Sequence, residues 1–452
     1  MVGITHRADI DMTSGKIAGH LIAFSIPLLV GNVFQQLYNT VDSVVVGNFV
    51  GKQALAAVGS VSPIINMLIG FFNGFASGAG VLVSRYYGAH DSGNVQKSVH
   101  TIVAVTVVLC VILSILGVLM TPLMLLAMQT PADVMEQAEA YLSIYFAGMS
   151  GLLLYNCGAG ILRAVGDTKR PLLFLIFSAF VNTVLDILFV VKFQMGVIGV
   201  AVATIIAQLA SSVLCFAVLM HTEGDYRIHW RKIRFDGKIL REICDLGFPS
   251  ALQLAITSFS NVFVQAYING FGSGCMAGWT SYNKIDAFAL LPIMSIAMAV
   301  TTFVGQNLGA GQIDRAKEGT RTGLIICEIA AVILLLPLML FAPQLICLFN
   351  STPEVVHFGT LFIRLISPFY LLITINQVLS GALRGAGDAR NCMLIMLGSF
   401  VAFRQIYLYA VSKLWDSIIP IAFGYPVGWV LCSILLIIYY KKGKWQTVLS
   451  RR

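Results

Sequence analysis

Charged residues are scarce in this chain of 452 residues. Asp, Glu, Lys and Arg together make up 11% of it, against roughly 25% in a typical globular protein. Hydrophobic residues make up 58%. This balance excludes a soluble enzyme, a disordered chain and a nucleic-acid-binding protein, although the formal net charge is +8. The composition is that of a polytopic membrane protein.

Cysteine and histidine are few and dispersed. The nine cysteines form no CxxC pair and no cluster with histidine, so neither a transition-metal site nor a disulfide framework is expected. A membrane-embedded enzyme would need a His, Cys or carboxylate cluster at one membrane face, and His357 in the tenth span has no such cluster beside it in the sequence. We therefore expect no enzyme and no cofactor. The polar segment up to Lys16 lacks the features of a removable signal peptide.

Apolar runs long enough to cross a bilayer recur along the whole chain. A span needs about 20 apolar residues, and this predicts an all-α protein of twelve transmembrane helices. The predicted spans are 18–47, 54–83, 98–120, 138–160, 171–192, 196–220, 243–270, 277–305, 319–342, 357–382, 392–412 and 417–440.

Lys and Arg are concentrated in the loops on one side of these spans. All but a handful of the 29 lie there, including six in the linker between the sixth and seventh spans. Such an excess marks the cytoplasmic side, and the even number of spans then places both termini in the cytoplasm. The linker is expected to lie on the membrane surface.

Short motifs recur at one offset of 221 residues. Gly51 matches Gly272, Gly160 matches Gly381 and Arg163 matches Arg384, and the pairs Gly88-Ala89 and Gly166-Asp167 recur as Gly309-Ala310 and Gly387-Asp388. Six spans in each half give the two halves the same orientation, which is the parallel-repeat plan of several transporters, with two pseudo-symmetric bundles around a central cleft. The predicted parts are an N-lobe (1–220), a cytoplasmic basic linker (221–242), a C-lobe (243–440) and a cytoplasmic tail (441–452). A duplicated scaffold is the alternative, but the uneven polar content of the spans favours transport.

Polar side chains in the first half converge at one depth. The first span carries Asn32, Gln35, Gln36, Asn39 and Asp42 along one face, the fifth carries Ser178, Asn182 and Asp186, and the sixth carries Thr204 and Gln208. At 1.5 Å per residue, Asp42, Asp186 and Thr204 lie roughly 8–12 Å in from the outer ends of their spans. Carboxylate, amide and hydroxyl oxygens suit Na⁺ or shared protons. We predict a coupling-ion site of Asp42, Asn182, Asp186 and Thr204; plain hydrogen bonding of Asn182 and Thr204 between helices is the alternative.

The second half lacks the equivalent carboxylates. At the same offset stand Phe263, Phe403, Tyr407 and Tyr425. The seventh span carries an amide and hydroxyl ladder instead, which is expected to form a polar cavity wall: Gln253, Thr257, Asn261, Gln265 and Asn269. For the charged residues Lys284, Asp286 and Arg404, a structural ion pair and a substrate contact both stay open.

Taken together, several stretches resemble the multidrug and toxic compound extrusion (MATE) family. They are Pro27 with Asn39-Thr40-Val41-Asp42 and Gly47, Gly88-Ala89, residues 162–168 (LRAVGDT), Asn182 with Asp186, Gly305-Gln306-Asn307 with Gly309-Ala310, and residues 383–388 (LRGAGD). The resemblance covers nearly the whole chain. It implies two six-helix lobes, a V-shaped cleft, alternating access, and export of organic, often cationic and amphipathic compounds in exchange for inward H⁺ or Na⁺.

The resemblance also implies roles for particular residues. The cation site of prokaryotic members with an N-lobe site carries over to Asp42, Asn182, Asp186 and Thr204, the first helix is expected to bend at Pro27, and Gln35 falls near the substrate cavity. The chain departs from the branch that has a Glu on the seventh helix and an Asp on the tenth. The predicted substrate-cleft residues are Gln35, Asn39, Gln253, Asn261, Lys284, Asp286 and Arg404.

The expected partners are a drug-like small molecule and the lipid bilayer of a prokaryotic plasma (inner) membrane, with no nucleic acid and a monomeric protein. The runner-up function is a flippase for a lipid-linked saccharide of the same superfamily. That function typically needs several cationic residues in the cleft, and here only Lys284 and Arg404 are candidates. A passive channel would not need the asymmetric pair Asp42 and Asp186.

Overall fold

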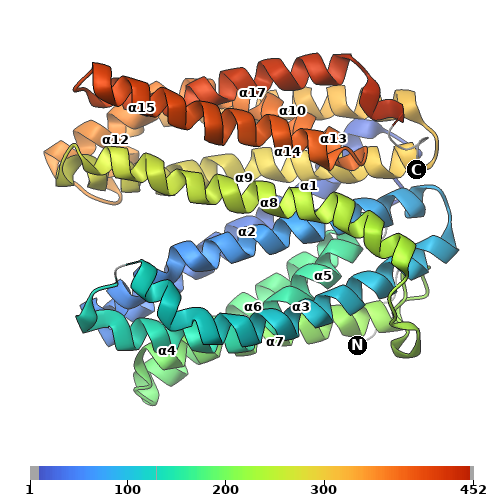
Figure 1. Ribbon diagram of the computed structural model, residues 1–452, viewed down its shortest axis with the longest axis horizontal. Helices are drawn as coiled ribbons and strands as arrows, with labels where there is room; N and C mark the ends of the chain where they lie inside the picture. Colours follow the sequence, from blue (N-terminus) through green and yellow to red (C-terminus); the bar gives the residue numbers. More distant parts are fainter. Residues whose placement is uncertain (1–9, 129, 448–452) are drawn as a thin grey trace. The chain divides into compact units, whose positions relative to one another are not determined.

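The computed structural model describes residues 10–128 and 130–447, and all regular secondary structure within them is helical (Figure 1). Eleven helices are long and apolar enough to cross a membrane, or twelve spans if one bent pair of helices counts as a single span. The predicted all-α membrane fold is confirmed.

The helices of the first half run from α1 to α7. They are α1 (Ile17–Val45), η1 (Val46–Val50), α2 (Lys52–Gly88), α3 (Ser92–Ala127), α4 (Ala132–Gly148), α5 (Ser150–Ala164), α6 (Lys169–Asp186), η2 (Ile187–Lys192) and α7 (Gly196–His221). A 3₁₀ turn, η3 (Trp230–Lys232), lies in the linker that follows.

The helices of the second half run from α8 to the C-terminal turn. They are α8 (Gly237–Asn269), α9 (Ser273–Gly309), α10 (Ile313–Leu340), α11 (Ala342–Cys347), α12 (Pro353–Ile366), η4 (Ser367–Phe369), α13 (Tyr370–Gly385), α14 (Ala389–Leu397), η5 (Gly398–Phe403), α15 (Arg404–Leu414), α16 (Ile418–Ala422), α17 (Gly424–Lys441) and η6 (Lys444–Thr447).

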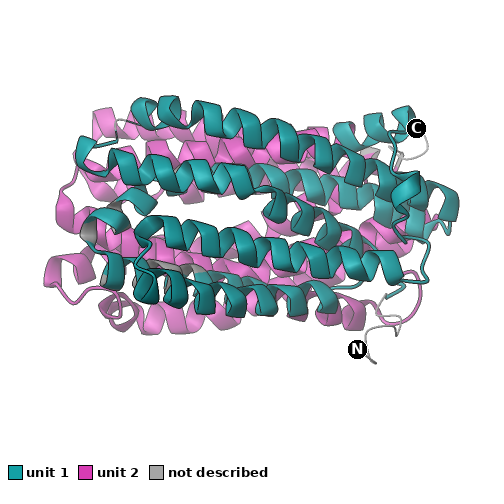
Figure 2. Ribbon diagram, turned by 90° about the horizontal axis from the view of Figure 1, so that it is seen from below, with its two compact units in different colours: residues 1–11, 30–244 teal, residues 12–29, 245–452 magenta. Residues whose placement is uncertain are grey.

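The chain divides into two compact units, coloured teal and magenta in Figure 2. Unit 1 holds residues 30–244 with residues 10–11, and unit 2 holds residues 12–29 and 245–447. Both α1 and α8 therefore contribute to two units, and the division of α1 falls two residues after Pro27. α1 continues through Pro27 as one helix.

The repeat read from the sequence is present in the backbone. α2 and α9 begin and end at equivalent repeat positions, and each follows a glycine with positive φ, 113° at Gly51 and 93° at Gly272. Gly166 and Gly387, in the two LRxxGD loops, have φ of 91° and 84°. Because residues with a Cβ rarely adopt this conformation, the recurring glycines are required by the turns themselves.

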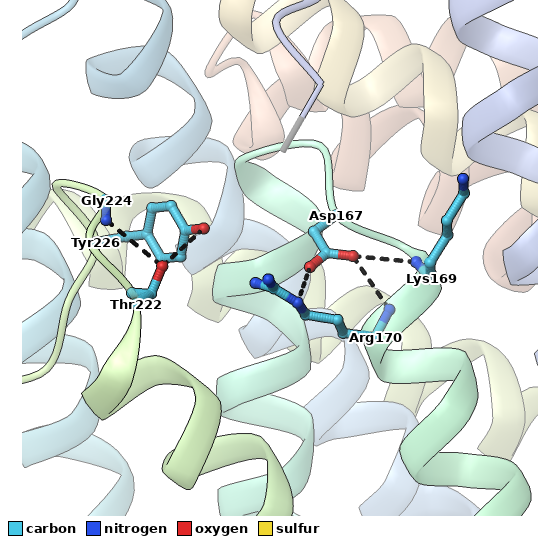
Figure 3. Close-up of polar contacts among 6 residues, drawn as sticks. All are labelled: Asp167, Lys169, Arg170, Thr222, Gly224 and Tyr226. Atoms are coloured by element: carbon cyan, nitrogen blue, oxygen red, sulfur yellow. Dashed lines mark hydrogen bonds and ion pairs between the residues drawn. The ribbon is translucent and has the colours of Figure 1, made fainter. Parts of the chain in front are cut away.

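The first LRxxGD loop is fixed by a buried aspartate (Figure 3). Asp167 is fully buried, and its Oδ1 accepts hydrogen bonds of 3.1 Å from the amides of Lys169 and Arg170 at the start of α6. Its Oδ2 lies 3.5 Å from Arg170 Nε. In the second loop, Asp388 accepts a hydrogen bond from the Tyr439 hydroxyl. The aspartates therefore satisfy backbone or side-chain donors at helix starts, which is a structural role.

The segment predicted as the fourth span, 138–160, is longer in the structure than predicted and is divided into two helices. The structure has α4 and α5 in its place, meeting at 45° around Met149. Glycine and serine at the joint are typical of kinks. A Cβ at Gly151 would lie 2.7 Å from the backbone nitrogen of Leu209, so this glycine also lets α5 approach α7 closely.

We predict that Gly166→Ala destabilises the protein. A Cβ there would lie 2.4 Å from the carbonyl oxygen of Ile10, and the positive φ adds about 1–2 kcal/mol. Gly237→Ala is the matched control, because its Cβ would meet no atom within 4 Å. Thermal unfolding in detergent should show a lower midpoint for Gly166→Ala alone, and equal midpoints for both variants would refute the steric argument.

Candidate functional site

Two helices of unit 1 end in π-helical turns next to the predicted ion ligands. η1 follows α1 directly, four residues beyond Asp42, and η2 begins one residue after Asp186. η1 packs against η2, and both pack against α7. π-helical turns inside helices are rare and frequent at functional sites. The packing places the C-terminal ends of α1 and α6 beside α7. This agrees with the similar depths predicted for Asp42, Asp186 and Thr204 in their spans.

Among the members of the set whose side chains are described, Asn182 and Asp186 are the most deeply buried. Asn182 is 1% exposed and Asp186 is 0% exposed, one turn apart on α6. Both the Nδ2 and the Oδ1 atoms of Asn182 are buried and have no hydrogen-bond partner among residues 10–128 and 130–447. A buried amide in that condition costs about 1–3 kcal/mol per group, which makes this side chain a candidate ligand for an ion.

The neighbouring hydroxyls on α6 and α7 are satisfied. Thr204 Oγ1 donates to the carbonyl of Val200 at 3.0 Å and keeps its lone pairs available. Ser178 Oγ donates to the carbonyl of Ala207 at 2.9 Å and so ties α6 to α7. Ser178 has a structural role, whereas the Thr204 oxygen can still accept a hydrogen bond or bind a cation.

The remaining N-half predictions lie on α1. Asp42 and Asn39 lie within the helix, but their side chains are outside the part that the structure describes. Gln35 is half-buried, and Pro27 is buried. Of the four predicted ion ligands, the described side chains are Asn182, Asp186 and Thr204.

A second polar site lies inside unit 2, in a cavity of about 190 Å³. Asp286 from α9 lines it, and its Oδ1 accepts hydrogen bonds from the hydroxyls of Tyr282, at 3.1 Å, and Tyr370. Aromatic rings from α9 and α17 form its walls: Trp279, Tyr282, Tyr425 and Trp429. A carboxylate among aromatic faces suits an organic cation, because both attract positive charge.

Arg404 and Asn261 line the same cavity. Arg404 is 3% exposed, and its Nη2 donates to Ser260 Oγ at 2.8 Å and to Asn261 Oδ1 at 2.9 Å. Its guanidinium lies over the ring of Tyr425, 4.7 Å from the centroid. Arg404 is therefore held by neutral oxygens and an aromatic face, with no ion pair to Asp286.

Two predicted cleft residues lie elsewhere in unit 2. Lys284 lines a separate, open hollow, and its Nζ is 5.4 Å from the ring centroid of Phe349. Gln253 is 2% exposed and donates to Met396 Sδ, so it is enclosed between α8 and α14. The cavity thus brings together Asn261, Asp286 and Arg404 but not Lys284 or Gln253.

Sequence reasoning missed the tyrosines that hold Asp286. Tyr282 stands one helical turn before it, so an i, i+4 search would have found the pair. Tyr370 is 84 residues away in the sequence and gives no local signal.

We predict that Asn182→Leu removes ion dependence without destabilising the fold. The substitution replaces an amide that has no described partner with an apolar group of similar size, which is nearly neutral or stabilising. Thermal unfolding should be followed against Na⁺ at fixed pH and against pH without Na⁺. A ligand that binds only the folded state raises the midpoint, and this rise should vanish in the variant.

Ser178→Ala is the matched control one turn away. It should lose about 1 kcal/mol of stability with its hydrogen bond to Ala207 but keep the ion dependence. An Asn182→Leu protein with wild-type ion dependence would exclude this amide from the ion site.

Comparison with known proteins adds three findings. The family model MatE matches residues 27–188 and again residues 249–409. The probable multidrug resistance protein YpnP of Bacillus subtilis is 30% identical over 439 residues, covering 97% of this chain and 98% of that protein. YoeA of the same organism, also named a probable multidrug resistance protein, is 28% identical over 431 residues, covering 94% and 93%.

Among solved structures, an outward-facing multidrug resistance MATE family transporter of the MOP superfamily superposes with a TM-score of 0.91 at 23% identity. The match covers 99% of this chain and 100% of that one. At this identity the likeness shows the shared fold.

Proposed function

This chain belongs to the MatE family, and from that premise we propose that it is a secondary active exporter. It moves organic, often cationic and amphipathic compounds out of a prokaryotic cell in exchange for inward H⁺ or Na⁺, by alternating access. Membership confirms the resemblance, and it confirms the expectation that the chain is not an enzyme.

The observation that carries the proposal is the Asn182 amide. It is buried, both of its polar atoms lack a described partner, and it stands one turn from the fully buried Asp186 on α6. A bare scaffold gains nothing from such a pair, because intramembrane polar groups are costly unless they bind something. With Thr204 on α7 and Asp42 on α1, the pair forms an oxygen-rich site for Na⁺ or a proton.

Charge at this site provides the switch. When both carboxylates are ionised and empty, they repel each other in a medium of low dielectric, and α1 and α6 are held apart. When Na⁺ or a proton is bound, the two helix ends approach and α1 bends at Pro27, which narrows the N-lobe part of the substrate cavity and displaces the drug. An ion shifts this equilibrium only by its difference in affinity between the two states, typically about 1–3 kcal/mol.

The cavity of unit 2 provides a place for the substrate. Its volume of about 190 Å³ accommodates one aromatic or ammonium group and not a whole drug-sized molecule, since drug pockets measure about 300–1,000 Å³. Asp286 and the rings of Trp279, Tyr282 and Trp429 favour a cationic group, while Asn261 contributes polar contacts and Arg404 lies over the fourth ring, Tyr425. We therefore assign recognition of the substrate's cationic end to this cavity.

The alternative of a flippase for lipid-linked saccharides is disfavoured by the same cavity. A pyrophosphate needs several cations, and Asp286 would repel it. The protein is proposed to act as a monomer in the plasma membrane, with both termini in the cytoplasm.

We predict that Asp186→Asn abolishes gradient-driven export while the protein remains folded. The variant cannot cycle between charged and neutral forms, so it cannot exchange an ion for a drug. Efflux of a fluorescent cation from proteoliposomes should be measured with a pH gradient alone and with a Na⁺ gradient alone. The wild type should respond to at least one gradient, and export by Asp186→Asn at the wild-type rate would overturn the coupling role.

We also predict that Asp286→Asn lowers affinity for a cationic dye about tenfold but spares a neutral analogue, because it removes one charge from the aromatic cavity. Lys284→Gln, two residues away in a different hollow, is the control and should change neither affinity. Fluorescence titration in detergent measures both. Equal loss of both ligands in Asp286→Asn would indicate a structural defect instead.

A further inference from the structure

The segment between α7 and α8 is rich in positive charge. The basic linker, residues 221–242, includes the first turn of α8. Four acidic residues lie in it, so its net charge is +2 with His221 and His229 neutral. The six cationic side chains are Arg227, Arg231, Lys232, Arg234, Lys238 and Arg241.

One side of the basic linker is fixed to unit 1. Tyr226 and Ile228 are buried, at 1% and 2% exposure. The Thr222 hydroxyl lies 3.3 Å from the Tyr226 hydroxyl and accepts a hydrogen bond from the Gly224 amide at 3.4 Å (Figure 3). The Ile228 amide donates to the carbonyl of Leu219 at 2.9 Å. This anchoring decides which side chains face outward.

The linker then follows α3. Asp225 accepts a hydrogen bond from the Ser92 hydroxyl at the start of α3, at 2.6 Å. Farther along α3, the amide of His229 donates to His100 Nε2 at 3.0 Å, and the amide of Asp236 donates to Thr101 Oγ1 at 3.3 Å. The chain thus reaches about 12 Å along α3, at 1.5 Å per residue.

These contacts fix the linker's depth in the membrane. From Ile102 to Met120, α3 carries no charged residue, and on this run Val111, Ile115 and Leu119 are more than half exposed. Such a surface faces lipid tails. His100 and Thr101 immediately precede the apolar run, so the linker lies at the level of the lipid headgroups and not free in the cytoplasm.

The outward side of the linker matches that environment. Trp230 is 63% exposed and Phe235 is 52% exposed. Exposed tryptophan is typical of membrane–water interfaces, where one end of the ring is apolar and the other polar. These two rings are flanked in the sequence by Arg231, Lys232 and Arg234.

Three of the four acids of the linker are bound within the protein. Asp225 accepts a hydrogen bond from Ser92, Asp236 Oδ1 accepts hydrogen bonds from the amides that open α8, and Glu242 accepts one from the Tyr86 hydroxyl. Four cationic side chains make no hydrogen bond or ion pair within the part of the chain that the structure describes: Arg231, Arg234, Lys238 and Arg241. These cationic side chains are therefore available to bind anions outside the protein.

We propose that the basic linker is a binding surface for anionic phospholipids of the cytoplasmic leaflet. Trp230 and Phe235 insert at the interface, and the neighbouring Arg and Lys side chains bind headgroup phosphates. Each basic residue near an anionic surface contributes about 1 kcal/mol, or roughly a fivefold enrichment of the lipid. A soluble acidic protein is disfavoured because the linker lies beside the apolar surface of α3.

The test measures which lipid lies next to Trp230. The protein is placed in vesicles of phosphatidylcholine and phosphatidylglycerol in equal amounts, with brominated chains on one lipid or on the other. Bromine quenches nearby tryptophan, and the wild type minus Trp230→Phe isolates the signal of Trp230. Brominated phosphatidylglycerol should quench this signal more strongly than brominated phosphatidylcholine.

Two variants of equal charge change provide the comparison. The triple variant R231Q/R234Q/K238Q should lose the preference for phosphatidylglycerol by fivefold or more. The triple variant R321Q/R390Q/K442Q, with the changes at other exposed cytoplasmic cations, should keep it. If the first variant fails to assemble, wild-type protein in about 1 M salt, where the Debye length is about 3 Å, should show the same loss.

Three results would overturn the proposal. Equal quenching by the two brominated lipids in the wild type would mean interfacial contact without headgroup recognition. No quenching of Trp230 would place the linker in water. Release of quenching by a soluble polyanion, with no change in bulk lipid, would assign the surface to a soluble partner.

Discussion

A polar side chain inside an apolar layer must find its partner within the protein, because lipid supplies none. Most hydroxyls here meet this constraint within their own helix, as Thr106 and Thr204 do by donating to a carbonyl one turn earlier. Arg404 meets it with neutral oxygens and the face of Tyr425. Asn182 has no described partner, and we propose that a bound ion meets the constraint there.

The two halves meet the same constraint differently. At the repeat positions of Asn182 and Asp186, the second half has Phe403 and Tyr407, and the Tyr407 hydroxyl donates to the carbonyl of Pro420 at 3.0 Å. At the position of Thr204 it has Tyr425, which covers Arg404. An aromatic residue therefore stands at each of the three positions that correspond to these predicted ligands, and a carboxylate of the second half lines a cavity from α9, at Asp286. The two halves share one helical framework, and we propose that the polar residues placed in it assign ion coupling to the first half and recognition of the substrate's cationic end to the second.

Much of this arrangement could be predicted from the sequence, since helix length, the 221-residue offset and the four-residue spacing of Asn182 and Asp186 are local properties. The joint at Met149 could not, because its glycines signal a break only once α5 packs against α7. The hydrogen bond of Tyr370 to Asp286 links residues far apart in the chain. The separation of Lys284 from Asp286 follows from helical geometry, but the cavity that each one lines depends on packing between helices.

We propose that the ion and the drug compete because the ion site controls the approach of α1 to α6. The most direct measurement is the affinity of a fluorescent cationic drug for purified protein in detergent, titrated across pH without Na⁺ and across Na⁺ at fixed pH. Drug affinity should fall as protons or Na⁺ saturate the site, by a factor of about 5–150 for a coupling of 1–3 kcal/mol. A drug affinity that stays constant over both titrations would contradict it.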